Sequence, residues 1–147
     1  MNLDNARARH ITLHIGTHKT GTTFLQECLA AQVERLKTQG VYLLNDGPNH
    51  SWLYLAFCDH PENEHEMMKR GLAHPREAAA WAEQRRRQLD AELAACPLSH
   101  ILITGEELSR LPPDGVHRLL AALRAHAERD PAHGAEQVPE HRHRMAR

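Results

Sequence analysis

Apolar positions along the chain follow two patterns, short continuous runs and longer stretches with helical spacing. The continuous runs cover residues 10–15, 41–44 and 100–104, and each is typical of a buried strand. Helical spacing is found over residues 22–39, 51–58, 75–95 and 116–127, and a further short helix is expected to begin at 61–64. Pro75 suits a first helical turn, and Gly40 follows the first helix where a left-handed residue is common.

The order of these elements predicts an α/β fold. A strand, a helix and a strand within residues 10–44 have the length of a βαβ unit, and such a crossover makes the two strands parallel. We therefore expect one helix-rich α/β domain over residues 1–128. Residues 129–147 contain no Leu, Ile, Phe, Tyr or Trp, so we expect a disordered tail that cannot bury a core.

Charge and composition narrow the range of functions. The 18 Lys and Arg residues nearly balance 19 Asp and Glu, which argues against a dedicated nucleic-acid binder. Three cysteines form no CxxC pair, so we expect neither a disulfide scaffold nor a metal site. No apolar stretch approaches the ~20 residues of a membrane span, and the N-terminus lacks a secretory signal, so we expect a cytoplasmic protein.

The segment most indicative of chemistry is Gly-Thr-His-Lys-Thr-Gly-Thr-Thr at residues 16–23, between the first predicted strand and helix. Gly16 and Gly21 allow tight turns, and backbone amides at a helix N-terminus attract an anion. Lys19 adds a positive charge, but it precedes the second glycine, so the segment is not a Walker A motif. The structural alternative is a strand-to-helix turn in which Gly and Thr serve only geometry and capping.

The residues LHIGTHKTGTTFLQ resemble the 5′-phosphosulfate-binding loop of sulfotransferases that use 3′-phosphoadenosine 5′-phosphosulfate (PAPS), closest to the carbohydrate-type and bacterial members. A weaker likeness continues through HSWLYLAF and ILITGEELSRL to about Glu128. The resemblance implies a three-layer α/β/α fold of the P-loop nucleoside-triphosphate-hydrolase type with a parallel sheet. It also implies sulfuryl transfer to a small-molecule or carbohydrate acceptor, without a metal.

The same resemblance assigns roles within the loop. Lys19 is expected to contact the 5′-phosphate and the bridging oxygen, where negative charge grows as the S–O bond breaks. The residues expected to bind the co-substrate are Gly16, Thr17, His18, Lys19, Thr20, Gly21, Thr22 and Thr23.

A general base must take the proton of the acceptor, and three side chains are candidates. Glu106 and Glu107 directly follow the third predicted strand, and the carboxyl ends of parallel strands share one crevice with the loop. Because related sulfotransferases place a Glu base there, we expect Glu106 to be the base and Glu107 to contact substrate. The alternative is a solvated acid pair opening the next turn. His50 is a further candidate for the base or an acceptor contact, against a capping or surface role.

The Arg85-Arg86-Arg87 run on the helix over 75–95 has two interpretations. It is basic enough to suggest an acidic polymer as partner. Glu83 and Arg87 are spaced i,i+4, however, and Asp90 lies near Arg86 and Arg87, so we expect a solvated helix face.

The resemblance departs from the family at a second element, which binds the 3′-phosphate through a strand ending in Arg and a later Ser. Residues 129–131 read Arg-Asp-Pro, but a helical stretch precedes them and no Ser or Thr follows Ser109. We therefore expect an incomplete, N-terminal portion of a sulfotransferase, truncated near Glu128. Two alternatives stay open, a P-loop nucleotide kinase-like phosphotransferase and a non-catalytic remnant that retains an anion-binding loop.

Overall fold

The computed structural model of the protein describes residues 9–16, 21–45, 47 and 49–128. These residues form three strands, β1 (His10–His14), β2 (Val41–Leu43) and β3 (His100–Thr104). The helices are α1 (Thr22–Ala30), α2 (Val33–Thr38), α3 (Trp52–Phe57), α4 (His65–Lys69), α5 (Pro75–Ala95) and α6 (Pro113–Ala127). Two 3₁₀ helices complete them, η1 (Pro61–Asn63) and η2 (Glu106–Arg110).

The strands form a parallel sheet in the order β1-β3-β2. The register pairs Ile11 with Ile101 on one side of β3 and Tyr42 with Ile101 on the other. The predicted α/β class with parallel strands is confirmed. The strands of the predicted βαβ unit, β1 and β2, are not neighbours, because β3 lies between them and pairs with both.

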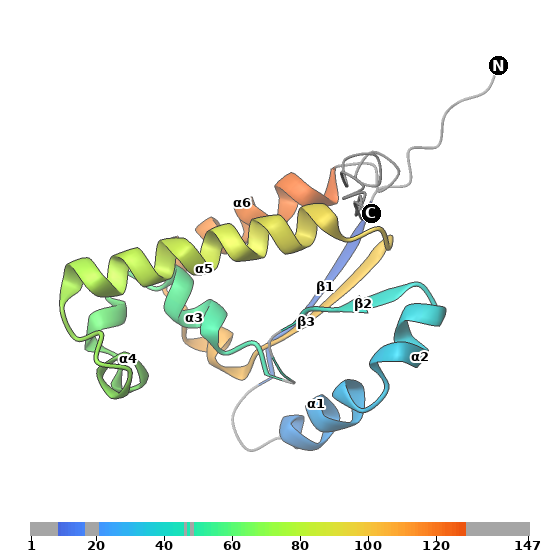
Figure 1. Ribbon diagram of the computed structural model, residues 1–147, viewed down its shortest axis with the longest axis horizontal. Coiled ribbons are helices and arrows are strands. Elements are labelled where there is room, and N and C mark those ends of the chain that lie inside the picture. The colour runs from blue at the N-terminus through green and yellow to red at the C-terminus, as the bar shows by residue number, and fades with distance from the viewer. Residues whose placement is uncertain (1–8, 17–20, 46, 48, 129–147) are drawn as a thin grey trace, which may run out of the picture.

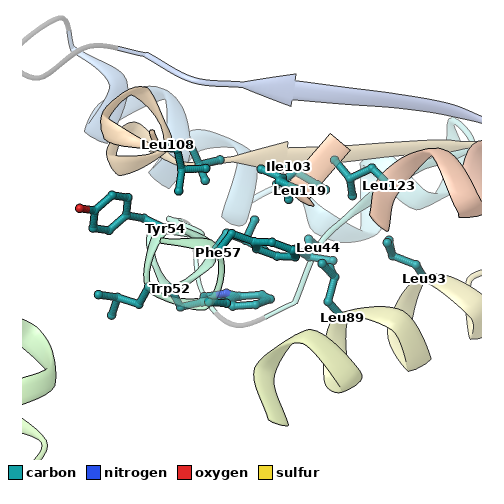
Figure 2. Close-up of a cluster of buried hydrophobic side chains, with 14 of the residues drawn as sticks. Leu44, Trp52, Tyr54, Phe57, Leu89, Leu93, Ile103, Leu108, Leu119 and Leu123 are labelled. Atoms are coloured by element: carbon teal, nitrogen blue, oxygen red, sulfur yellow. The ribbon is translucent and has the colours of Figure 1, made fainter. Parts of the chain in front are cut away.

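Helices lie on both sides of this sheet (Figure 1), with α1 and α2 on one side and α3, α5 and α6 on the other. The main core forms on the second side, where Ile101 and Ile103 of β3 are fully buried. Side chains of α3, α5 and α6, among them Phe57, Leu89 and Leu119, pack over them (Figure 2). Apolar side chains of these three helices are therefore buried in one core with the β3 residues.

The first helix differs from its prediction. The expected continuous helix over residues 22–39 is two helices, because a turn at Ala31 and Gln32 separates α1 from α2. On α1 the side chains of Phe24 and Leu25 are 72% and 44% exposed, so the described part of the chain does not bury them. The apolar residues of α1 have the predicted helical spacing, but the described residues do not bury all of them.

None of the helices in the described part of the chain has the length and apolar character that a membrane crossing requires. The predicted tail, residues 129–147, lies outside the described residues.

Candidate functional site

The loop that resembles a phosphosulfate-binding segment joins the carboxyl end of β1 to the start of α1. Thr17, His18, Lys19 and Thr20 lie outside the described residues. Gly21 is the N-cap of α1 and has a φ of 78°, a left-handed conformation that favours glycine. Because glycine has no side chain, the N-cap residue does not accept a hydrogen bond from the backbone amides in the first turn of α1 through a side chain.

The two candidate carboxylates lie at the same end of the sheet as this loop. The amide of Gly105 donates to the carbonyl of His14 at 3.0 Å, so the ends of β1 and β3 are held side by side. Glu106 and Glu107 follow Gly105 directly as the first residues of η2, and both are half-buried. The structure therefore places both glutamates beside the carboxyl end of β1, from which the loop starts (Figure 1).

Glu107 belongs to a network of charged and aromatic side chains. Arg110 donates to its carboxylate at 2.6 Å and to that of Glu64 at 3.3 Å. The guanidinium also lies 4.7 Å from the ring centroid of Tyr54, within cation–π range. The Tyr54 hydroxyl donates to Glu64 at 2.7 Å, and burial together with this bond raises the pKa of Tyr54 to about 12. The phenol is thus a neutral hydrogen-bond donor at physiological pH.

This network forms part of the wall of a pocket of about 360 Å³, within the size range of small-ligand sites. Two segments that follow strands, residues 49–55 after β2 and residues 107–110 after β3, contribute to it, and α4 with its flanking residues closes the other side. The lining residues are Asn49, Ser51, Trp52, Tyr54, Leu55, Glu64, His65, Glu66, Arg70, Glu107 and Arg110. Of the predicted candidates, Glu107 lines the pocket, whereas Glu106 and His50 do not.

His50 has a different role from the predicted contact with substrate. Its side chain is fully buried, and the Thr104 amide donates to its Nδ1 at 2.9 Å. Because Nδ1 accepts this bond, Nε2 carries the proton and donates to the Leu44 carbonyl at 2.7 Å. The backbone amide of His50 also donates to the carbonyl of Thr104 at 2.7 Å. The ring is therefore no surface side chain but an internal link between the residue after β2 and the end of β3.

Several side chains of the pocket were not singled out from the sequence. Trp52 and Tyr54 lie in the segment 51–58 that was predicted as a short helix, and both are largely buried. The Tyr54 hydroxyl, however, points away from the apolar cluster (Figure 2). Arg110 and Glu64 lie 46 positions apart, so only the fold brings them together. For Arg110 the available signal was its position soon after β3, since residues that follow strands of a parallel sheet line its carboxyl edge.

Within the described residues, no group of three or more His, Cys, Asp or Glu side chains is arranged to hold a metal ion. The chain matches no protein-family model, no curated protein and no solved structure at a significant level.

Proposed function

We propose that the protein binds PAPS and transfers its sulfuryl group to the hydroxyl or amine of an acceptor, on a fold of the P-loop nucleoside-triphosphate-hydrolase type. The observation that supports this proposal most is the meeting of three features at one edge of the sheet. These are the carboxyl end of β1, from which the loop starts, the glutamate pair after β3, and the pocket that Glu107 lines. Open α/β sheets bind their ligands in this position.

The residues present fit a bound phosphosulfate. Gly21 is left-handed and a Cβ built on it would meet no atom within 4 Å, so the described residues leave open space around the start of α1. The helix that follows has nine residues and no acidic side chain in its first turn that would compete with an anion. Residues 22 and 23 are both threonine and supply hydroxyl donors.

Lys19 carries the electrostatic part of the proposed mechanism. The co-substrate supplies a sulfuryl group that is activated by its bond to a phosphate leaving group. Lys19 places its ammonium group against the bridging oxygen, where negative charge accumulates in the transition state. The amides at the start of α1 hold the 5′-phosphate and keep the reacting atoms aligned.

Glu106 carries the acid–base part. It takes the proton of the acceptor as the acceptor oxygen or nitrogen forms its bond to sulfur and the bond from sulfur to the phosphate oxygen breaks. The electron pair of the broken bond stays on the phosphate, so adenosine 3′,5′-bisphosphate leaves with Lys19 as its counterion. Glu107 is held by Arg110 in the pocket wall and contacts the acceptor.

Two matched substitutions distinguish the roles of Glu106 and Glu107. Glu106→Gln removes the base and keeps the side-chain shape, so we expect the rate of sulfuryl transfer from radiolabelled PAPS to fall about 10²-fold. Glu107→Gln is the matched variant one residue away, and we expect it to raise the KM of the acceptor with a smaller change in kcat. The opposite order of effects would assign the base to Glu107, and full activity in both variants would contradict a glutamate base.

A P-loop kinase is the main competing enzyme class, and the same assay distinguishes it. We expect no phosphoryl transfer from Mg²⁺-ATP to the acceptors that accept sulfate, because Lys19 precedes Gly21 rather than following it as in a Walker A loop. Turnover of Mg²⁺-ATP together with indifference to PAPS would contradict the proposed function.

A further inference from the structure

A second hollow, of about 280 Å³, adjoins the pocket that contains Glu107. It is lined by Asn49, Ser51, Trp52, Arg70, Trp81 and Arg85. Four of these residues, Asn49, Ser51, Trp52 and Arg70, also line the larger pocket, so the two hollows are neighbouring parts of one groove. We refer to the six lining residues of the second hollow as the Arg–Trp site.

Two guanidinium groups in the Arg–Trp site lie against indole rings. Arg85 lies 4.1 Å from the ring centroid of Trp52 and 5.9 Å from that of Trp81. Arg70 lies 5.6 Å from the centroid of the Trp81 ring, so two guanidinium groups lie within cation–π range of this indole. Stacking on an indole holds a guanidinium by its face, and the planar fork of N–H donors suits binding of an oxyanion. Within the chain, Arg85 donates to the side-chain oxygen of Gln88 at 3.1 Å.

This arrangement corrects the expectation for the arginine run. Arg87 is solvated as predicted, with a side chain 78% exposed and paired with Glu83. Arg85 instead is half-buried over Trp52, and Arg86 donates to the carbonyl of Ala56. Helical periodicity explains the difference, because successive residues of the run face different directions from α5.

The indole of Trp52 is a mostly buried part of the Arg–Trp site. Trp52 is 9% exposed, and its Nε1 makes no hydrogen bond to any residue that the structure describes. A buried donor without a partner is uncommon in native structures, and such a donor is commonly completed by a ligand or a water molecule. An indole N–H needs an acceptor, which an oxyanion supplies.

Arg70 forms an ion pair within the chain, but this pair does not prevent it from binding a ligand. Its partner is Glu66 at 3.1 Å on the adjoining turn, and the two side chains are 47% and 52% exposed. Exposed pairs of this kind contribute little to stability, so a ligand oxyanion can replace Glu66 at small cost.

We propose that the Arg–Trp site binds an oxyanion group, a sulfate, phosphate or carboxylate, through Arg70 and Arg85 held on Trp81 and Trp52. Because the site continues into the pocket of Glu107, the oxyanion belongs to the acceptor. This second step rests on the proposed function and makes the substrate class an acceptor that already carries an anionic group beside the hydroxyl or amine that reacts.

The chain provides its own probe for this proposal, because its only two tryptophans, Trp52 and Trp81, both lie in the site. Tryptophan fluorescence is followed while sodium sulfate replaces sodium chloride at constant ionic strength. We expect a saturable change in the wild type and a midpoint about tenfold higher in Arg70→Gln, because one charge-assisted pair of hydrogen bonds is lost. Arg87→Gln is the matched control on α5 and keeps the wild-type midpoint.

Two further measurements extend this test. One distinguishes an oxyanion carried by the acceptor from free sulfate, and the other distinguishes the Arg–Trp site from the proposed function. Glucose 6-sulfate is expected to bind with a lower midpoint than free sulfate and than glucose; equal midpoints for sulfate and the sugar sulfate would overturn the assignment to the acceptor. Lys19→Ala is expected to keep the response of the Arg–Trp site, so a failure of the proposed function leaves this measurement unaffected. A change that does not saturate, or one that is unaltered in folded Arg70→Gln, would overturn the site itself.

Discussion

Replacing Lys19 by alanine should lower kcat/KM for sulfuryl transfer from PAPS by about 10³-fold, the largest effect on activity that we expect from a single substitution. The loss arises because the ammonium group stabilises charge that is present on the bridging oxygen in the transition state and hardly present in the ground state. We therefore expect most of the change in kcat. Initial rates measured over a range of PAPS concentrations separate the two parameters.

Lys37→Ala is the matched control for this prediction. Lys37 is on α2, and its ammonium group forms an exposed i,i+3 ion pair with Glu34 at 3.0 Å. Lys37→Ala removes the same charge and the same side chain as Lys19→Ala but leaves the loop unchanged, so we expect activity close to that of the wild type. An equal loss in both variants would indicate a general effect of charge and would contradict the role of Lys19.

Replacing His50 by alanine should lower the free energy of unfolding by about 4 kcal/mol, the largest effect on stability that we expect. In the wild type the imidazole forms hydrogen bonds with the buried amide of Thr104 and the carbonyl of Leu44. The variant leaves both backbone groups without this partner. It also leaves a cavity at a fully buried position. Urea denaturation followed by circular dichroism measures the change.

His117→Ala serves as the control, because His117 is an exposed histidine on α6 and we expect a change within about 0.5 kcal/mol. The comparison also decides between the two roles considered for His50. A variant with wild-type stability and no transferase activity would return His50 to the candidates for the base and contradict the structural role.

The parts of the fold that the sequence predicted are those with local causes. The bounds of β3 agree with the apolar run His100–Thr104, and those of α5 agree with a stretch that begins at Pro75 and ends before Pro97. In both segments the spacing of apolar residues, the turn residues and the packing agree. The position of Glu106 and Glu107 at the carboxyl edge also followed from the sequence, because it depends only on strands being parallel.

The parts that could not be predicted depend on contacts between distant segments. One example is the strand order, in which β3 lies between β1 and β2. All three strands come from apolar runs of similar character, and such runs do not determine which strands become neighbours. The break between α1 and α2 follows no Gly or Pro, since Ala31 and Gln32 are both compatible with a helix. The burial of His50 and the stacking of Arg85 on Trp52 depend on packing between residues that are far apart in the chain.

The most direct test of the central claim, that residues 16–23 bind the phosphosulfate end of PAPS, is a calorimetric titration with adenosine 3′,5′-bisphosphate. We predict saturable binding of one equivalent by the folded wild type, at least about tenfold weaker binding by Lys19→Ala, and unchanged binding by Lys37→Ala. Absence of binding by the folded wild type, or the same dissociation constant in Lys19→Ala, would contradict the claim.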